Sequence, residues 1–118
     1  MVLWYGNIGL HVGARGNPSV PFVLEVSLKV CERAYTVRNR LGIHLRAANK
    51  VVRVASRFDS DVFLAKDGLE VDAKSIMGIT LLAAACGSQV IVKARGKDAE
   101  EAVQALGALI ESKFQEED

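Results

Sequence analysis

The sequence predicts an α+β fold, an open-faced two-layer sandwich in which a four-stranded antiparallel sheet carries three helices on one face. Three observations predict it. Apolar residues alternate with period two in four segments after residue 30 and recur at helical spacing in three others. These segments follow the order β-α-β-β-α-β-α. Each of them is apolar on one side only, and a single sheet with helices on one face satisfies that pattern.

The length of the chain allows one such domain. Its 118 residues, 50% of them apolar and 25% charged, supply a single two-layer core and not two. We divide the chain into an N-terminal extension, 1–29, and a domain, 30–118. Glycines and prolines interrupt every period up to residue 21, so the extension is expected to be irregular, although Phe22 to Val30 alternate as in a strand. The extension is either a genuine part of the protein or the result of a start codon assigned too far upstream.

The first half of the domain begins with a strand. In AYTVRN, 34–39, Tyr35 and Val37 share a face, and Leu41-Gly42 ends the strand in a turn. The segments DVFLAK and LEVDA, joined through Asp67-Gly68, predict a β-hairpin because Asp-Gly readily adopts the positive φ angles of a tight turn. A helix is predicted between the turn and the hairpin, and its core-facing stripe consists of Ala48, Val51, Val52, Ala55 and Phe58.

The second half adds a short helix, a strand and a longer helix. Ser75 is the expected N-cap of the apolar helix IMGITLLAAAC, which Gly87 ends. SQVIVKAR, 88–95, alternates as a strand. Asp98 is the expected N-cap of the final helix. The apolar side of that helix consists of Ala99, Ala102, Val103, Leu106, Leu109, Ile110 and Phe114.

The charge balance excludes several classes of function. Fifteen basic and fourteen acidic side chains give a formal net charge of +1, which offers no global field for nucleic acid or an anionic membrane. The longest apolar run, Ile76 to Cys86, is too short to span a bilayer. Cys31 and Cys86 form no metal-binding or disulfide pattern. We therefore expect a cytoplasmic protein without membrane insertion.

One histidine stands where a reactive group would be useful. His44 comes directly before the first helical stripe, at the position of a cap. The first N–H groups of a helix lack intrahelical partners and point toward such a residue, and they suit a phosphate. The positive end of the helix also favours a neutral, nucleophilic imidazole. A phosphoryl group on one ring nitrogen would be stabilised there.

A basic stripe lies beside this histidine. Arg46 can bond phosphate oxygens, and the next basic residues follow at spacings of four, three and four along the helix. An acidic partner could dock on them. The alternative is that His44 is an ordinary cap or strand-end residue and that the stripe is a solvated helix face. The stripe consists of Arg46, Lys50, Arg53 and Arg57.

Two motifs carry a resemblance to a known family. GIHLRAA, 42–48, and KSIMG, 74–78, resemble the two signatures of the HPr family, the histidine phosphocarriers of the bacterial phosphotransferase system, and the likeness covers residues 30–118. It implies the same β-α-β-β-α-β-α sandwich. It also implies that His44 accepts phosphate on Nδ1 from enzyme I and passes it to IIA-type components of a sugar or nitrogen-regulatory branch.

The resemblance also implies roles for other residues. Arg46 would contact the phosphoryl group and the partner, and the backbone N–H groups of Leu45 and Arg46 would bind its oxygens. Ser75 matches the position that HPr kinase/phosphorylase modifies in some members. No cofactor or metal is implied, and we expect a monomer that binds no nucleic acid. The implied partner-docking residues are Ile76, Met77, Thr80, Lys50 and Arg53.

Two residues depart from the family's motif. Leu45 stands where the family usually has a small residue, and Ala47 where it has a proline. Alanine is a good helix former, so the loss of the proline should destabilise the first turn of the helix only slightly. Leu45 is expected either to crowd the histidine or to reshape the docking surface. A regulatory binding module of the same fold, controlled by phosphorylation of Ser75 and with little transport flux, is therefore the alternative function. A ferredoxin-like small-molecule-binding domain is a weaker one, because it leaves both motifs unexplained.

Overall fold

The computed structural model describes residues 2–11 and 25–116, with side chains described from residue 29 onward. Its regular elements are β1 (Val2–His11), β2 (Glu25–Thr36), α1 (Leu45–Ala55), β3 (Asp61–Lys66), β4 (Leu69–Asp72), α2 (Ile76–Leu82), β5 (Gln89–Arg95), α3 (Ala99–Glu111) and a final 3-10 turn, η2 (Lys113–Gln115).

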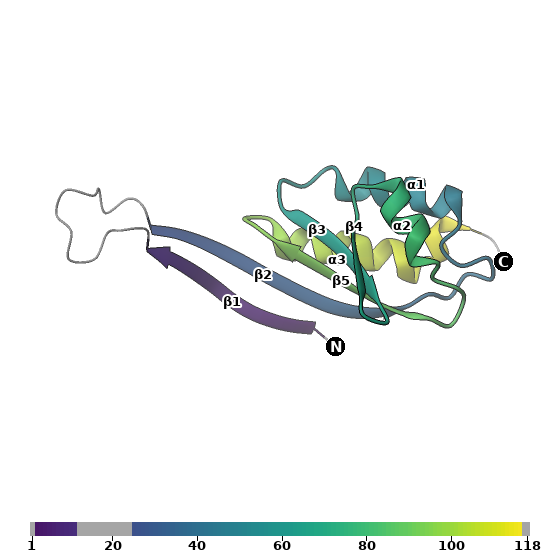
Figure 1. The fold of residues 1–118 in the computed structure, drawn as a ribbon, viewed down its shortest axis with the longest axis horizontal. Coiled ribbons are helices and arrows are strands. Elements are labelled where there is room, and N and C mark those ends of the chain that lie inside the picture. Colours follow the sequence, from purple (N-terminus) through teal and green to yellow (C-terminus); the bar gives the residue numbers. More distant parts are fainter. Residues whose placement is uncertain (1, 12–24, 117–118) are drawn as a thin grey trace.

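The predicted sandwich is confirmed. Neighbouring strands pair antiparallel in the order β1-β2-β5-β3-β4, and the three α-helices lie on one side of the sheet (Figure 1). From β2 to α3 the elements follow the predicted order β-α-β-β-α-β-α. Strands β2 to β5 are the four predicted strands, and β1 extends the sheet by a fifth at the edge of β2.

The N-terminal part differs from the sequence expectation. Residues 2–11, expected to be irregular, form β1, and β2 runs without interruption through the division we placed at residue 30. No glycine or proline stands between Val30 and Thr36, so nothing stops a strand there. The strand predicted from the alternation of Phe22 to Val30 and the strand AYTVRN thus become one. Phe22 itself, Pro18 and Pro21 lie outside the described residues.

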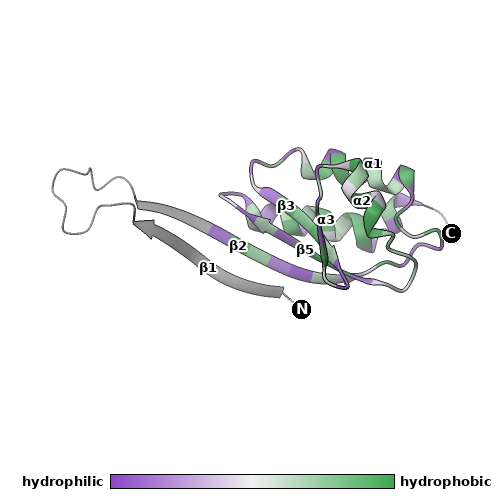
Figure 2. Ribbon diagram, viewed as in Figure 1, coloured by the Kyte–Doolittle hydropathy of each residue, from purple (hydrophilic) through white to green (hydrophobic). Residues whose placement is uncertain are grey.

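The core lies between the helices and the inner face of the sheet. Alternate residues of β3 and β5 are buried because successive side chains of a strand point to opposite faces. Figure 2 shows green, hydrophobic segments in both the helices and the strands. The largest fully buried apolar side chains are those of Phe114, Leu64, Ile79, Leu106, Ile110 and six valines.

A glycine inside α3 allows that helix to lie close to β2. The Tyr35 ring is buried beneath α3, and its hydroxyl donates to Val103 O at 3.3 Å. A Cβ atom at Gly107 would overlap this ring. Glycine has poor helix propensity, but because it has no side chain it allows α3 to pack closely against Tyr35.

The hairpin prediction is confirmed. Strands β3 and β4 pair antiparallel with Lys66 opposite Leu69. The two residues between them, Asp67 and Gly68, have φ of +50° and +85°. Positive φ at both central positions is the geometry of a tight two-residue turn whose twist matches that of the strands.

Two helix-end predictions were wrong in detail. The helix α2 begins after Ser75 as predicted but ends at Leu82, with Ala83 in the left-handed conformation, so Gly87 does not end it. Gly87 instead shapes the turn before β5, where its N–H donates to Val37 O at 2.8 Å. Asp98 stands at the N-cap of α3 without a side-chain capping bond. Its carboxylate accepts instead from Asp59 N–H, Ser60 N–H and the Ser60 hydroxyl, because the loop before β3 presents three donors to it.

Candidate functional site

The backbone before α1 holds His44 at the helix entrance. Gly42 has a φ of +68°, and a Cβ there would lie 2.5 Å from Ala84 O, so only glycine fits. This close approach lets Ile43 N–H donate to Ala84 O at 2.8 Å. His44 then adopts an extended conformation, with φ −87° and ψ −175°, and is the N-cap of α1 as the sequence predicted.

Both ring nitrogens of His44 have hydrogen-bond partners. Nδ1 accepts from Arg46 N–H, with a distance of 3.1 Å between the two nitrogens. Nε2 bonds to Glu116 Oε2. A carboxylate only accepts, so these partners assign the proton to Nε2 and leave a lone pair on Nδ1. The ring is a quarter exposed, which keeps that nitrogen within reach of another protein.

The carboxylate of Glu116 is also held by a second residue, Asn39. Its Oε1 accepts from Asn39 Nδ2 at 2.9 Å, and the same buried amide donates to Gly42 O at 2.6 Å. Burial raises the pKa of Glu116, but the hydrogen bonds from Asn39 and His44 and the positive charge of Lys50 outweigh it and lower the pKa below its usual value. Glu116 is therefore ionised near neutral pH.

An unusual backbone turn carries Glu116 to the histidine. Lys113, Phe114 and Gln115 have φ angles of +58°, +56° and +62°, a left-handed conformation that costs an L-residue roughly 1–2 kcal/mol. Burial of the Phe114 side chain and a hydrogen bond of 2.6 Å from Lys50 Nζ to Phe114 O hold the turn in place. We predicted that Lys50 docks a partner, but in the structure its side chain hydrogen-bonds the C-terminal segment.

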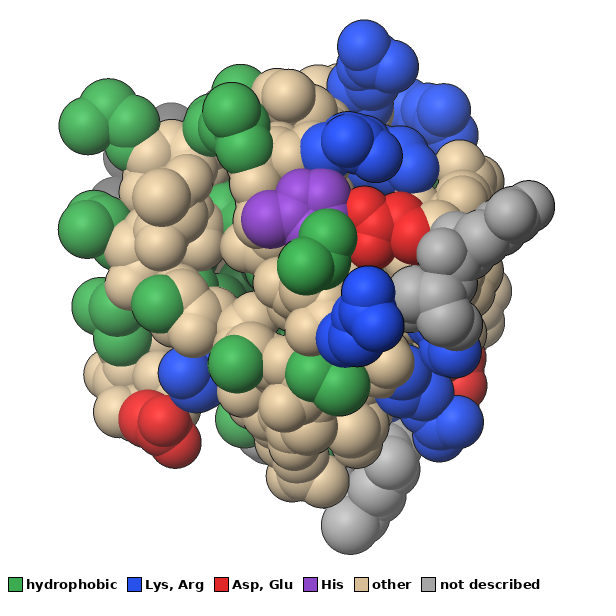
Figure 3. All heavy atoms as spheres, turned by 90° about the vertical axis from the view of Figure 1, so that its right-hand side faces the viewer, with side chains coloured by type: hydrophobic (Ala, Val, Ile, Leu, Met, Phe, Trp, Pro, Cys, Tyr) green, Lys and Arg blue, Asp and Glu red, His purple; other side chains and the backbone are tan. Residues whose placement is uncertain are grey.

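The histidine borders an exposed hydrophobic surface. Figure 3 shows hydrophobic side chains gathered beside a histidine, with an acidic side chain and several basic ones around them. Helix α2 packs against α1, and together with the preceding turn they expose large apolar residues. We call these the apolar surface: Leu41 (69% exposed), Leu45 (64%), Ile76 (38%), Met77 (78%) and Leu81 (70%).

The predicted docking residues take different positions. Ile76 and Met77 belong to the apolar surface, and Thr80 is exposed on the same helix. Arg46 and Arg53 are exposed on α1. Leu45 is nearly two-thirds exposed, so it adds to the apolar surface rather than being packed against the ring. Ala47, which replaces the family's proline, is fully buried in the first turn of α1.

Sequence reasoning missed two residues of the site. Asn39 lies before the turn, and Glu116 is 72 residues from the histidine that it contacts. A charged end such as QEED has the pattern of a solvated terminus, and no periodicity relates it to residue 44. The apolar residues Leu41 and Leu81 were also missed, because a single exposed leucine has no signature in a sequence.

Ser75 is the N-cap of α2, as predicted. Its hydroxyl oxygen accepts from Gly78 N–H at 3.1 Å, and its backbone is extended before the helix begins. The side chain is partly exposed. A phosphate on this oxygen would lie at the helix entrance, next to Ile76 and Met77 of the apolar surface.

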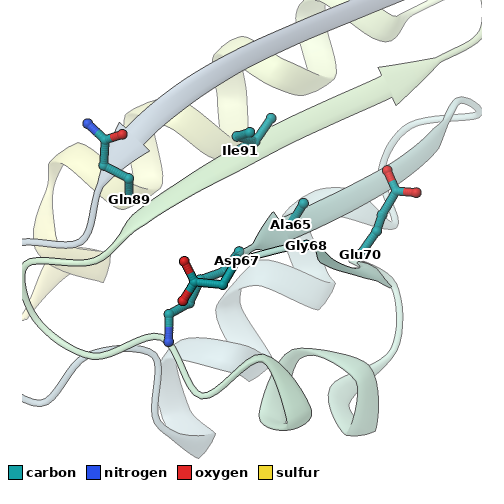
Figure 4. A pocket seen from close by; sticks show the side chains of 7 residues that line it. Ala65, Asp67, Gly68, Glu70, Gln89 and Ile91 are labelled. Carbon is teal, nitrogen blue, oxygen red and sulfur yellow. The ribbon is translucent and has the colours of Figure 1, made fainter.

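A pocket lies away from the histidine. It has a volume of about 370 Å³ and lies at the β3–β4 hairpin beside β5 (Figure 4). Its lining residues are Ala65, Lys66, Asp67, Gly68, Glu70, Gln89 and Ile91. Among residues with described side chains, no group of His, Cys, Asp and Glu is placed to hold a metal ion. None of the helices described is long and apolar enough to cross a membrane.

The geometry supports one kind of chemistry. A neutral imidazole presents the lone pair of Nδ1 to the first N–H groups of α1, and a carboxylate holds the proton on the opposite nitrogen. Such a nitrogen is a nucleophile, and an anion bonded to it would lie against helix N–H groups and the positive end of the helix dipole. The site is suited to accepting a phosphoryl group.

Comparisons with known proteins agree with this chemistry. A family model described as the PTS HPr component phosphorylation site matches residues 31–112. The phosphocarrier protein HPr of Xylella fastidiosa is 46% identical over 86 residues, which are 73% of this chain and 97% of the relative. The HPr-like protein Crh of Bacillus subtilis is 47% identical over 75 residues, 64% of this chain and 88% of Crh. A crystal structure of HPr from Thermoanaerobacter tengcongensis superposes with a TM-score of 0.71 at 46% identity, covering 74% of this chain and 98% of that one.

Proposed function

The chain belongs to the HPr family, whose members are phosphocarrier proteins of the phosphotransferase system and not enzymes, and we propose that its carrier residue is His44. The observation that supports this most is the pair of hydrogen bonds on the imidazole. They leave the lone pair on Nδ1, at the entrance of α1, and the proton on Nε2.

We propose that transfer begins with attack of the Nδ1 lone pair on the phosphorus carried by enzyme I. As the new N–P bond forms, the bond between phosphorus and the donor breaks, and its electron pair leaves with the donor. The His44 ring gains positive charge in this step. Glu116, which accepts from Nε2–H, stabilises that charge because its carboxylate is ionised and held by Asn39.

The backbone N–H groups of Leu45 and Arg46 are proposed to receive the phosphoryl oxygens. Arg46 N–H now donates to Nδ1 at 3.1 Å, so a phosphorus atom bonded there would bring its oxygens close to the same donor. The exposed guanidinium of Arg46 adds charge at the rim. Transfer to an acceptor reverses these steps.

The apolar surface is proposed to dock both the donor and the acceptors. It combines exposed leucines and Met77 with the cations Arg46 and Arg53, an apolar centre with a charged rim. The donor is proposed to be enzyme I and the acceptors IIA-type components of a sugar or nitrogen-regulatory branch. We expect the transfers to take place in the cytoplasm.

A phosphorylation assay tests the proposal. The chain is incubated with enzyme I and labelled phosphoenolpyruvate, and the acid-labile label is located by peptide mapping. We expect label on His44, with phosphorus on Nδ1 as read by NMR. His44→Ala should abolish it. His11→Ala, which changes the chain's other histidine, is the matched control and should keep it. Label on His11 or a fully labelled His44→Ala variant would disprove the assignment.

A second candidate function uses Ser75. The similarity to the HPr-like protein Crh and the partly exposed N-cap hydroxyl of Ser75 favour a regulatory role in which a kinase modifies this serine. A phosphate there would be stabilised by the N–H groups at the start of α2 and would add negative charge to the apolar surface. Docking to partners that bind this surface would change with the modification.

HPr kinase/phosphorylase and ATP distinguish this role from simple capping. Label that Ser75→Ala removes and His44→Ala retains would support regulation at Ser75. Ser75→Asp should then slow phosphorylation of His44 by enzyme I. If no label appears on Ser75 while His44 is labelled rapidly, the serine is a helix cap only. The sugar and nitrogen branches are separated by offering IIA components of each kind to the phosphorylated chain.

A further inference from the structure

The first strand gives the sheet a long, uncharged edge. Strand β1 spans ten residues, VLWYGNIGLH, and contains no Asp, Glu, Lys, Arg or Pro. It is the outermost strand on its side, and within the described part of the chain it pairs with β2 alone. Natural edge strands are usually shortened or protected by charged residues and proline. Charged residues and proline are absent from β1, and the irregularity in its pairing with β2 is a register shift between Trp4 and Asn7.

The opposite edge of the same sheet is protected. Strand β4 has only four residues, Leu69–Asp72, and two of these, Glu70 and Asp72, are acidic and exposed. Glu70 also forms an ion pair with Lys93 of β5, with an N–O distance of 3.3 Å. A short edge with charges at every second position disfavours the addition of a strand. The two edges of one sheet thus differ in a way that points to β1 as the edge that binds.

Strand β1 is an addition to the domain that the family comparison recognises. The match to the family model begins at residue 31, inside β2. The relative from Xylella fastidiosa aligns over 97% of its own length with only 73% of this chain. The phosphocarrier function proposed for His44 therefore does not account for β1, and the extension needs an explanation of its own.

In place of the monomer that we expected from the family resemblance, we propose that β1 pairs antiparallel with β1 of a second copy of this chain, joining the two sheets in a two-fold symmetric dimer. A strand pairing with itself in this way forms a closed, self-complementary contact. Backbone hydrogen bonds supply the affinity. The absence of charged residues means that no like charges face each other across the axis, where they would oppose pairing.

The dimer leaves the phosphoryl-acceptor site free. Figure 1 shows β1 along the sheet edge, away from α1 and α2, which carry Leu45, Arg46 and Met77. Each copy could therefore bind its partner while paired. The prediction concerns association alone, so its failure would leave the labelling of His44 unaffected.

Sedimentation equilibrium of the full chain tests the proposal. We expect a species of twice the 12.7 kDa chain mass at micromolar concentration. Removal of residues 1–24 should give a monomer that enzyme I still phosphorylates, since this truncation keeps all of β2. Leu69→Lys, on the exposed part of β4, is the matched edge control and should remain dimeric. A monomeric full chain, a dimeric truncation or an assembly that continues beyond two copies would each overturn the proposal.

A single substitution near the proposed axis tests the pairing without deleting the strand. Asn7 lies near the middle of β1 and opposite Lys29 of β2. Asn7→Asp should strengthen the pairing of β1 with β2 through that lysine, but would place two carboxylates close together across the axis. We expect at least a tenfold weaker dimer with no loss of thermal stability. An unchanged dimer constant would count against β1–β1 pairing.

Crosslinking tests the direction of the strands. In a Cys86→Ser background, which removes the exposed cysteine, Asn7→Cys should form a reducible dimer because the two copies meet near the axis. Val2→Cys should not, since antiparallel strands separate its two copies by about 30 Å, beyond the reach of a disulfide. Crosslinking through Val2 and not Asn7 would contradict the antiparallel arrangement.

Discussion

At the scale of single residues, His44 depends on two groups from distant parts of the chain. Arg46 N–H forms a hydrogen bond with one ring nitrogen, and the carboxylate of Glu116 forms one with the other. The first partner follows automatically from the N-cap position. The second requires that α3 end correctly and that the following turn adopt a left-handed backbone. The position of the imidazole is therefore local in origin, but its protonation pattern is determined by the tertiary fold.

Replacement of Glu116 by glutamine tests this dependence. Glu116→Gln keeps the shape of the side chain but removes the charge that is proposed to stabilise the phosphorylated ring, and a charge-assisted hydrogen bond contributes about 1.5–3 kcal/mol. We expect phosphorylation by enzyme I to slow by about tenfold or more. Nitrogen NMR of His44 should show a smaller fraction of the form with its proton on Nε2. Glu111→Gln, an exposed glutamate of α3, is the control. Equal rates and tautomers in the three proteins would rule out the role of Glu116.

The sequence could predict His44 and Arg46 because their relation is local. A cap residue and the N–H group two positions later are brought together by any helix that begins there. Asn39 and Glu116 could not be predicted, since their contact with the site depends on how α3 packs and where Phe114 is buried. The sequence also indicated Lys50 as a docking cation, but could not show that Phe114 O would bind it.

At the scale of elements, α3 is positioned by contacts at both of its ends and in its middle. Asp98 joins its start to the loop before β3, Gly107 allows it to pack on Tyr35, and η2 follows its end. Periodicity predicted the buried side of this helix well, because the apolar stripe alone determines which side faces the sheet. It placed Asp98 correctly at the N-cap but not the bonds of its carboxylate, since a sequence does not show which of several backbone donors a carboxylate will meet.

Introduction of a methyl group at Gly107 should destabilise the protein. Alanine is favoured over glycine in a helix by about 1 kcal/mol, but its Cβ would overlap the Tyr35 ring. We expect Gly107→Ala to lower the free energy of unfolding by about 1–3 kcal/mol, measured by urea denaturation. In the background of Tyr35→Leu the same change should cost much less. Additive effects in this double-mutant cycle would show that the ring is not the obstacle.

Acid should weaken the attachment of α3 through Asp98. The hydrogen bond from Ser60, aided by the N–H groups of Asp59 and Ser60, lowers the pKa of Asp98 below its usual 3.8 and outweighs the effect of burial. A carboxyl whose pKa is depressed by folding stabilises the native state above its unfolded pKa, and this contribution is lost as the pH falls through the folded value. The loss therefore occurs below about pH 3.8.

Unfolding curves at pH 7 and at stepwise lower pH measure this contribution. Asp98→Asn should be less stable than the wild type at pH 7, and the difference should shrink as the pH falls below the usual pKa of the carboxyl. Ser60→Ala removes the largest single cause of the shift and should give an intermediate result. A constant difference between wild type and Asp98→Asn across this range would show that the carboxylate charge plays no part.

At the scale of the whole molecule, different parts of the surface are available for different contacts. The apolar surface lies on α1, α2 and the preceding turn, next to His44, while β1 forms a sheet edge on another side. The sequence predicted the sandwich because each element is apolar on one side. It did not predict β1, since Gly6 and Gly9 interrupt its alternation and pairing with β2 is a long-range property.

A charge on the apolar surface should weaken docking without unfolding the domain. Met77 is 78% exposed, so Met77→Asp removes little from the core. We expect the KM of enzyme I for this chain to rise by roughly tenfold, the effect of losing about 1.4 kcal/mol of binding energy. Leu69→Asp, on exposed β4, is the matched control and should leave the KM unchanged. Equal KM values for both variants would place the docking surface elsewhere.

The left-handed turn before Glu116 also determines when the site can form. During synthesis, the helix entrance with His44 leaves the ribosome long before residues 113–116 do, and domains can begin to fold while the chain is still growing. A nascent chain that ends before these residues therefore lacks the carboxylate that bonds Nε2 of His44. The carboxylate that orients the ring lies 72 residues further along the chain, so the hydrogen bonds on both ring nitrogens can form only after α3 and the turn that follows it have been synthesised.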